Sequence, residues 1–165
     1  MSWNAHPPGK LGAASTNDAY HMTAPRPDGS QAARCLTLAL ADAHVAADEV
    51  DYVNAHGSST PLNDKTETLA FKRAFGPHAP KLAVSGTKGY YGHPLGASGA
   101  IEAAVTALAL ARRWLHPTLN LCARDPECDL DYLVEPVAEH AAQIAVSNSF
   151  GFGGINAAIV MRSHA

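Results

Sequence analysis

Three polar or glycine-rich loops, each directly after a short apolar run, are the feature that most constrains the fold of this chain. The loops span residues 54–63, 85–96 and 147–154, and the runs before them span 50–53, 82–84 and 144–146. Longer patterns typical of helices begin near residues 30, 64 and 97. Alternating strands and helices predict an α/β class with a largely parallel sheet covered by helices on both faces. Because the functional loops of such sheets lie at the carboxyl ends of the strands, we expect the three loops to form one site.

Composition and charge exclude several classes of protein. The 165 residues are 47% hydrophobic and 16% charged, which is typical of one globular domain and not of a disordered chain. The net charge of −3 argues against a nucleic-acid partner. The apolar runs are too short to span a bilayer, and Pro7, Pro8 and Gly9 stand where a signal peptide would be apolar, so we expect a cytoplasmic protein with no membrane contact. The three cysteines lack the spacing of a zinc site, so no metal is expected.

Glu102 is the most informative charged residue. It lies in a helical segment, residues 100–110, that is apolar on nearly every side, and such helices are buried. A buried carboxylate without a partner would cost several kcal/mol, so Glu102 needs a cation. Lys88, in the loop just before this helix, is the nearest one in the sequence. We therefore expect a Lys88–Glu102 ion pair, the alternative being that Glu102 reaches solvent through a gap.

Two histidines stand in equivalent places. His56 and His93 each lie in a loop after a predicted strand, and each has a neighbouring glycine that permits close backbone approach to a ligand. One such histidine would more often be structural, but two favour a shared site. A neutral imidazole can donate a hydrogen bond to a carbonyl oxygen and stabilise an enolate that forms on it.

The other polar features can be explained by structural or solvent-exposed roles. The glycines of residues 148–156 could aim backbone amides at an oxyanion, but taken alone the segment is better explained as a hairpin turn. Asp64 and Glu67 resemble a capping box at the start of the second helix. The acidic cluster Asp125, Glu127, Asp129 and Asp131 is expected to be a solvated turn. Surface positions are also expected for His6, His78, His116, His140 and His164.

Several motifs together resemble one family. Residues 54–60, Thr87-Lys88 with Gly92-His93, and residues 148–156 stand in the order and approximate spacing of β-ketoacyl-acyl-carrier-protein synthases, condensing enzymes of the thiolase fold. Residues 96–110 are also similar, and residues 18–23 resemble a loop of the elongating, synthase II branch. The resemblance covers residues 15–162 and implies the C-terminal half of a thiolase-like fold, with a mixed, mostly parallel sheet and helices on both faces.

The resemblance implies a role for each matching residue. His56 and His93 would be the catalytic histidines that hold a malonyl thioester and promote loss of carbon dioxide, with Lys88 as the active-site lysine and Glu102 as its partner. The oxyanion and gating positions would be Phe150, Gly151, Phe152 and Gly153, the pantetheine-binding hydroxyls Ser58 and Thr60, and the second gating loop Asp18, His21 and Thr23. The resemblance implies no resident cofactor, because the 4′-phosphopantetheine arm belongs to the acyl carrier protein.

The family also implies partners. Its nucleophilic cysteine lies at a helix N-terminus in the N-terminal half of the enzyme, and no cysteine of this chain has that context. We therefore expect the C-terminal catalytic half of a 3-oxoacyl-acyl-carrier-protein synthase, an acyltransferase of fatty acid or polyketide biosynthesis that is inactive alone. Its partners would be the N-terminal half, the acyl carrier protein and, as in the full-length family, a second copy. The alternatives are a non-catalytic partner subunit resembling a chain-length factor, an inactive truncated fragment, or an unrelated ligand-binding module.

The N-terminus departs from the family pattern. Aligned on residues 18–23, residues 1–14 fall where relatives begin a strand that we expect to be central in the sheet. Pro7 and Pro8 cannot donate the hydrogen bonds of a central strand, and Gly9 weakens the strand further. We therefore expect residues 1–14 to be irregular or truncated, the first strand to be largely missing, and the domain at 15–162 to be unstable in isolation.

Overall fold

The computed structural model describes residues 9–163. Its elements in chain order are β1 (Gly9–Asn17), α1 (Ser30–Asp42), η1 (Ala47–Glu49), β2 (Tyr52–Ala55), α2 (Asn63–Phe75), η2 (Gly76–Lys81), β3 (Ala83–Gly86), α3 (Lys88–Tyr91), η3 (Leu95–Ala97), α4 (Ser98–Arg112), β4 (Trp114–Leu115), β5 (Val137–Ala138), β6 (Ile144–Gly151) and β7 (Ile155–Arg162). The alternation of strands and helices confirms the predicted α/β class.

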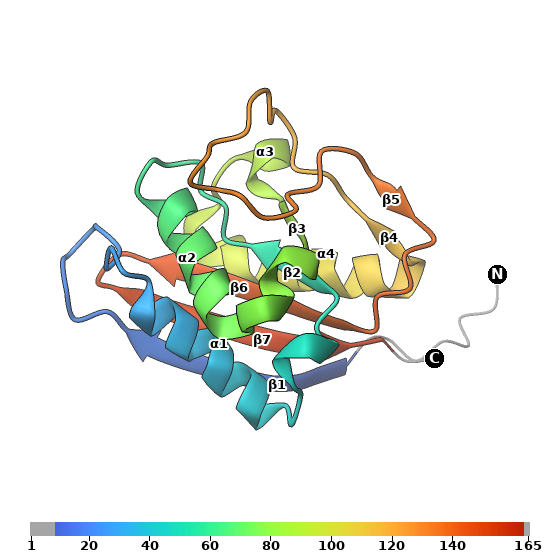
Figure 1. Cartoon of the computed structure of the whole chain (residues 1–165), viewed down its shortest axis with the longest axis horizontal. Helices are drawn as coiled ribbons and strands as arrows, with labels where there is room; N and C mark the ends of the chain where they lie inside the picture. The colour runs from blue at the N-terminus through green and yellow to red at the C-terminus, as the bar shows by residue number, and fades with distance from the viewer. Residues whose placement is uncertain (1–8, 164–165) are drawn as a thin grey trace.

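A five-stranded sheet in the order β1-β7-β6-β2-β3 forms the centre of the domain. Strand β2 pairs in parallel with β3 and β6, whereas β7 pairs antiparallel with β6 and β1. Helices α1 and α2 cover one face and α4 covers the other (Figure 1). The sheet is therefore mixed, as expected, but the parallel pairings are confined to its β6-β2-β3 side, where the three predicted loops begin.

Each face of the sheet has its own apolar core. On the side of α1 and α2, Leu36 and Phe71 pack against Val53 of β2. On the side of α4, Leu110 packs in a cluster with Tyr52 of β2. All four residues of β2 are buried, as is usual for a strand covered on both faces. Asn54 is the polar residue of this strand, and its side chain donates to Thr106 of α4 at 3.1 Å.

The first strand corrects the prediction for the N-terminus. Strand β1 is regular from Gly9 and pairs with β7 from Gly9↔Arg162 to Asn17↔Ile155, with a register shift between Lys10 and Gly12. It lies at the edge of the sheet and not at its centre. An edge strand needs one hydrogen-bonded neighbour only, and its start tolerates proline. The expectation of an irregular segment over 1–14 and a largely missing strand is thus wrong for residues 9–14, and the argument for instability loses its premise; residues 1–8 lie outside the described residues.

Both edges of the sheet are covered. Along β1, the Ala13 amide donates to the Asp42 carboxylate at 2.9 Å, and the Cys35 thiol donates to the Ala14 carbonyl at 3.3 Å. Both partners belong to α1, which therefore lies against the outer edge of β1. Along β3, the amide of Val84 donates to the Asp131 carbonyl at 3.1 Å. These contacts satisfy backbone groups that would otherwise be free to pair with another chain.

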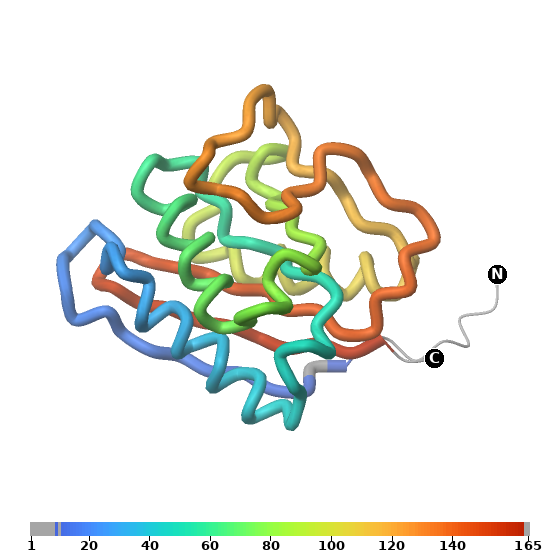
Figure 2. Tube along the Cα trace, viewed as in Figure 1, coloured from blue at the N-terminus to red at the C-terminus, as the bar shows by residue number. Residues whose placement is uncertain are grey.

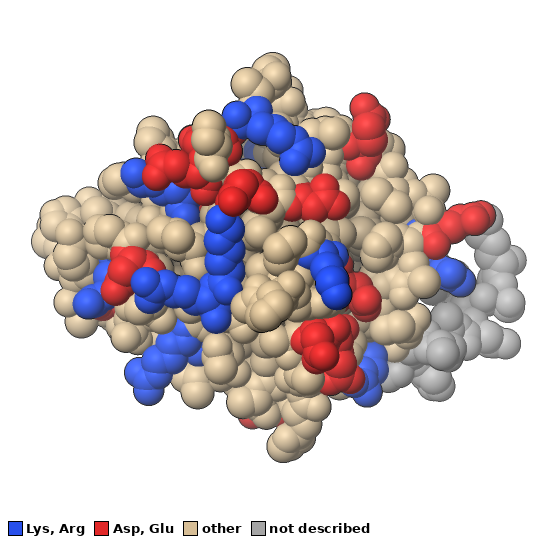
Figure 3. All heavy atoms as spheres, viewed as in Figure 1, with Lys and Arg blue, Asp and Glu red and all other residues tan. Residues whose placement is uncertain are grey.

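A long excursion, residues 116–142, arches over the end of the sheet beside α2 and α3 (Figures 1 and 2). Two members of the acidic cluster contact lysines of α2: Glu127 lies 3.8 Å from Lys65, and Asp129 pairs with Lys72. Both pairs are exposed, so each contributes at most about 1 kcal/mol. Positive and negative side chains are interspersed on the face that carries α1 and α2 (Figure 3), so neither sign dominates it.

The contact between β1 and α1 predicts a strong effect of Gly12→Ala. A Cβ atom at Gly12 would lie 2.5 Å from the Ala43 amide nitrogen and 2.8 Å from the Ala39 carbonyl oxygen. We expect a loss of about 1–3 kcal/mol in the free energy of unfolding, as in overpacked cores, measured by urea denaturation. Gly96→Ala is the control, because a Cβ there meets nothing within 4 Å. Equal stability of the two variants would contradict the close packing of β1 on α1.

Candidate active site

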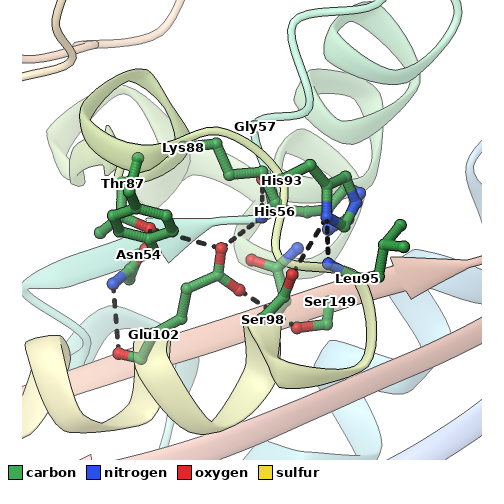
Figure 4. A network of polar contacts seen from close by, with 12 residues as sticks. Asn54, His56, Gly57, Thr87, Lys88, His93, Leu95, Ser98, Glu102 and Ser149 are labelled. Atoms are coloured by element: carbon green, nitrogen blue, oxygen red, sulfur yellow. Dashed lines mark hydrogen bonds and ion pairs between the residues drawn. The ribbon is translucent and has the colours of Figure 1, made fainter.

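The loops predicted after β2 and β3 leave the sheet beside β6. The third predicted loop, residues 147–154, is wrong for residues 147–151, because they continue β6 and pair with β7. The parallel register pairs Ala55 of β2 with Gly86 of β3, so the next residues, His56 and Thr87, leave the sheet side by side. Figure 4 shows the side chains of these loops converging above the first turns of α4. The site is therefore assembled from segments that are far apart in the sequence.

The expected ion pair between Lys88 and Glu102 is present in the structure. Lys88 opens α3 and its Nζ contacts both Glu102 Oε1 and the His56 carbonyl oxygen (Figure 4). Glu102 is 0% exposed, which excludes the alternative of a gap to solvent. Burial raises the pKa of Glu102, and the hydrogen bond and charge of Lys88 oppose that rise. Further donors reach the carboxylate from Thr87 and Ser149, each at 3.4 Å.

The two histidines lie at one cavity. The rings of His56 and His93 meet edge to face with centroids 5.3 Å apart. Both line a cavity of about 350 Å³ together with residues of α4, β6 and β7. Burial, then Lys88, then His93 lower the pKa of His56 to about 3. The His56 ring is therefore neutral near pH 7 and can only hydrogen-bond a ligand, not protonate it.

Hydrogen bonds define the tautomer of His93. The Leu95 amide donates to Nδ1 of His93 at 3.1 Å, and the Ser98 hydroxyl lies 3.1 Å from the same atom (Figure 4). A backbone amide can only donate, so Nδ1 is an acceptor and a neutral ring carries its hydrogen on Nε2. Because His93 lines the cavity, that N–H is available to an acceptor placed there.

The glycine-rich segment is a hairpin, the simpler of its two interpretations. Strands β6 and β7 pair up to Gly151↔Ile155 and leave residues 152–154 as the turn. Phe150 lies against the His56 ring at 5.5 Å and lines the cavity, as does Gly151. The Gly153 amide donates to the Met22 carbonyl at 2.7 Å, so it is not free to serve an oxyanion as expected. The Phe152 side chain is 77% exposed and lies outside the cavity lining.

The predicted second gating loop is hydrogen-bonded to this turn through Asp18. The Asp18 amide donates to the Gly154 carbonyl at 2.8 Å, and the Asp18 carboxylate accepts from Asn156 Nδ2 at 2.8 Å. His21 Nδ1 accepts from the Thr23 amide at 3.1 Å, which shapes the loop internally. The structure thus joins Asp18 to the hairpin, while His21 and Thr23 lie beyond the residues that line the cavity.

The two expected pantetheine hydroxyls lie on the surface. Ser58 and Thr60 follow His56 in the loop after β2, and their hydroxyls are 3.1 Å apart. Thr60 Oγ1 also accepts from the Asn63 amide at 3.3 Å and so helps to start α2. Neither residue lines the cavity.

Glu67 is the functional residue that the sequence analysis missed. It is no cap: its carboxylate is buried and accepts from the His56 amide at 2.8 Å and the Gly57 amide at 3.0 Å. Asn148 of β6 donates to it at 2.7 Å and Asn63 at 3.1 Å. Burial raises the pKa of Glu67, and these four donors oppose the rise. The available signal was position, because Phe71, four residues later on the same helical face, is an apolar core residue.

One of the histidines expected at the surface is buried. His116 is 4% exposed and begins the excursion directly after β4, in contact with Tyr52 and Ser85. His78 is half-buried and hydrogen-bonded to the Val50 carbonyl at 2.8 Å. His6 and His164 lie outside the described residues.

One helical segment is long and apolar enough to cross a membrane by length and composition. It spans η3 and α4, Leu95–Arg112, with a mean hydropathy of 1.2 over 18 residues. In this domain the segment packs on the sheet through its polar positions as well as its apolar ones. Glu102 pairs with Lys88, and Thr106 accepts from Asn54 of β2 at 3.1 Å. The core helix of a globular domain satisfies the same length and hydropathy criteria.

The chain is similar to known proteins over most of its length. The β-ketoacyl synthase C-terminal domain matches residues 10–122. A 3-oxoacyl-[acyl-carrier-protein] synthase 2 from Synechocystis sp. is 50% identical over 154 residues, which are 93% of this chain and 37% of that protein. One from Coxiella burnetii is 46% identical over 151 residues, 92% of this chain and 36% of that protein. The chain thus spans little more than a third of the curated relatives it matches.

Solved structures show the same similarity. A ketosynthase of a type II polyketide synthase, in complex with its acyl-carrier protein, superimposes with a TM-score of 0.90 at 41% identity, over 93% of this chain and 38% of that chain. A β-ketoacyl synthase from Burkholderia phymatum gives a TM-score of 0.89 at 41% identity, over 96% and 38%. The ishigamide ketosynthase/chain length factor gives 0.88 at 34% identity, over 94% and 38%. These superpositions confirm the predicted thiolase-like fold.

A double-mutant cycle tests the coupling between Lys88 and Glu102. Glu102→Ala leaves Lys88 buried without its partner, so we expect a loss of about 3–5 kcal/mol in the free energy of unfolding. Lys88→Met combined with Glu102→Leu should cost less than the sum of the two single changes, because no unpaired charge is left. Glu127→Ala, which removes the exposed pair with Lys65, is the control and should change stability by less than about 1 kcal/mol. Additive single effects in urea denaturation would contradict the coupling.

The four donors around Glu67 predict a specific effect of Glu67→Gln. Glutamine replaces one acceptor oxygen by a donor, so at least one N–H of the loop would face another N–H. We expect a loss of about 1–3 kcal/mol in the free energy of unfolding and shifted amide resonances of His56 and Gly57. Glu135→Gln, at an exposed position, should stay within about 0.5 kcal/mol of the parent. Unmoved His56 and Gly57 resonances would show that Glu67 does not hold this loop.

Proposed function

The chain belongs to the β-ketoacyl synthase family, and from that premise we propose that it supplies the decarboxylating half of the active site of a 3-oxoacyl-acyl-carrier-protein synthase, an acyltransferase. The observation that carries the proposal is the pair of rings, His56 and His93, facing one cavity 5.3 Å apart. Two imidazole rings at one point can donate hydrogen bonds to the same carbonyl oxygen. A malonyl thioester presents such an oxygen beside the bond that breaks.

The proposed role of the two histidines follows from the negative charge that develops on the thioester oxygen during decarboxylation. When the malonyl carboxylate leaves as carbon dioxide, its electron pair remains on the α-carbon and spreads onto the thioester oxygen as an enolate. The Nε2 hydrogen of His93, directed by the contacts at Nδ1, is a donor for that oxygen. His56 is a second donor, and its low pKa keeps it neutral, so it stabilises the enolate without protonating it. The enolate carbon then attacks the carbonyl carbon of an acyl thioester, so that a carbon–carbon bond forms while the carbon–sulfur bond breaks and the thiolate leaves.

Lys88 acts in this proposal through His56. Its ammonium group binds the His56 carbonyl and Glu102 at once, so the charge is balanced by Glu102 and the backbone of His56 is held in place. Glu67 holds the amide of the same residue from the opposite side of the loop. The imidazole therefore has a fixed orientation before substrate arrives, which reduces the reorganisation that catalysis requires.

The remaining site residues have proposed roles around this centre. Phe150 and Gly151 line the acyl side of the cavity, and Ser58 and Thr60 bind the pantetheine arm. We assign gating to Phe152 and Gly153, and to Asp18, His21 and Thr23 of the loop that is hydrogen-bonded to their turn. No resident cofactor is needed, because the 4′-phosphopantetheine arm is part of the acyl carrier protein that delivers the substrate.

The proposed partners would cover an apolar surface beside the cavity. Leu95 is 76% exposed and Ile155 is more than half exposed, and both line the cavity, while Phe152 of the hairpin turn is 77% exposed. Large exposed apolar side chains around a cavity are typical of an interface. We assign it to the N-terminal synthase domain that carries the nucleophilic cysteine, since the relatives are longer than this chain. An acyl carrier protein and a second copy complete the proposed cytoplasmic assembly.

A non-catalytic subunit resembling a chain-length factor is the competing proposal. One similar structure is a ketosynthase/chain length factor. A subunit without chemistry has no need of two histidines at one cavity or of a buried lysine held between a carboxylate and a backbone carbonyl. The intact set His56, His93 and Lys88 therefore favours the catalytic assignment.

A domain exchange tests the proposal. This chain replaces the matching C-terminal part of the Synechocystis synthase, which is 50% identical to it, and release of carbon dioxide from malonyl-acyl carrier protein is measured. We expect activity, and a loss of about a hundredfold or more with His93→Ala. His44→Asn is the control, because His44 is exposed and asparagine tolerates its positive φ of 53°. A folded chimera without decarboxylation, or full activity of His93→Ala, would contradict the proposal.

A further inference from the structure

A closed triangle of buried polar side chains lies behind the active site. The Tyr52 hydroxyl is 2.9 Å from His116 Nε2 and 2.9 Å from the Ser85 hydroxyl, and Ser85 is 3.3 Å from His116 Nδ1. Tyr52 and Ser85 are 0% exposed and His116 is 4% exposed. The three side chains come from β2, β3 and the segment after β4. The apolar core does not require such a group, and the decarboxylation step does not use it.

The hydrogens of the triangle can be assigned from its geometry. The Pro117 carbonyl, which can only accept, is 3.2 Å from His116 Nδ1, so Nδ1 carries the hydrogen. Nε2 is then the acceptor for the Tyr52 hydroxyl, and the Ser85 hydroxyl donates to the Tyr52 oxygen. Burial lowers the pKa of His116, so the ring is neutral as this pattern requires. Each member is satisfied, which makes the arrangement rigid.

The segment after β4, residues 116–119, makes four further contacts with the turn that carries Lys88. Tyr90 donates from its hydroxyl to the Pro117 carbonyl at 3.0 Å, and its ring meets the His116 ring edge to face at 5.8 Å. The Gly86 amide donates to Thr118 Oγ1 at 3.2 Å. At Gly89 a Cβ would lie 3.2 Å from Leu119, so the two backbones are nearly in contact.

These contacts divide the turn into two sides. Ser85, Gly86, Gly89 and Tyr90 face residues 116–119. Thr87 and Lys88 point the other way, to Glu102. The position of the Lys88 ammonium group is therefore set from behind by the 116–119 segment. The Lys88 carbonyl also accepts from the Gly92 amide at 2.8 Å, so a shift of the turn would be passed to the neighbouring His93.

We propose that His116 is a positioning residue of the active site, acting through Tyr52, Ser85 and Tyr90 to hold the turn that carries Lys88. The inference rests on the proposed function, because it assigns His116 an effect on the reaction of that same site. Small displacements of catalytic groups reduce rates far more than they reduce binding. A residue that only filled the core would change stability and leave the rate of the folded enzyme unaltered.

His116→Phe is the decisive variant, because it keeps a ring against Tyr90 and removes both nitrogens. In the domain-exchange enzyme we expect kcat for malonyl decarboxylation to fall about tenfold with KM within about twofold. His116→Gln should recover most of the loss, since its side chain can again accept from Tyr52. The control is His78→Phe, which removes a hydrogen bond to the Val50 carbonyl away from the cavity and should leave kcat unchanged. An unchanged kcat for His116→Phe would overturn the proposal.

Backbone amide resonances of the folded protein provide the second measurement. His116→Phe should shift the amides of Gly86, Gly89 and Gly92, whereas His78→Phe should not; unmoved resonances would overturn the proposal whether or not the enzyme is active. An inactive parent enzyme would refute the proposed function alone, because the amide shifts still report the turn. If His116→Phe fails to fold, Tyr90→Phe is the alternative variant, because it removes only the hydroxyl that contacts Pro117. We expect it to lower kcat and to shift the same amide resonances, both by less than His116→Phe would.

Discussion

Two buried carboxylates hold the active site together, and they are neutralised in different ways. Glu102 meets a cation, Lys88, whereas Glu67 meets four N–H donors. A buried carboxylate without such partners would be strongly destabilising, so each one forces the chain around it to adopt a particular arrangement. Glu102 binds α4 to the loop after β3, and Glu67 binds α2 to the loop after β2 and to β6. His56 lies between them, with its amide held by one carboxylate and its carbonyl by the partner of the other.

The sequence predicted the parts of this arrangement that follow from burial of a single element. An apolar helix with one carboxylate required a cation close by, and Lys88 was the nearest. Parallel strands bring their carboxyl ends to one edge, so two histidines after two strands were expected to meet. The hairpin of β6 and β7 followed from two apolar runs around a glycine-rich turn. In each case the physical requirement could be stated without knowledge of the rest of the chain.

The parts that were missed depend on long-range pairing. Glu67 resembled a helix cap in the local pattern, and only the approach of the His56 loop and Asn148 gives it its role. His116 stands in a segment that the sequence places at the surface, and its buried partners come from strands 64 and 31 positions away. The first strand was placed at the centre of the sheet, whereas it pairs at the edge with β7, near the other end of the chain. Local sequence patterns do not predict contacts between residues this far apart in the chain.

The distribution of polarity connects the fold to the proposed reaction. Behind the histidines, the Lys88–Glu102 ion pair, the donors to Glu67 and the triangle at His116 hold buried polar side chains in place. At the cavity that the histidines face lie the exposed apolar side chains Leu95 and Ile155. An enolate is best stabilised by fixed donors where water is excluded, because electrostatic interactions strengthen as the dielectric falls. In the proposed assembly the partner domain excludes water from the site and also supplies the nucleophilic cysteine. Binding of that domain would therefore both close the site and complete its catalytic groups.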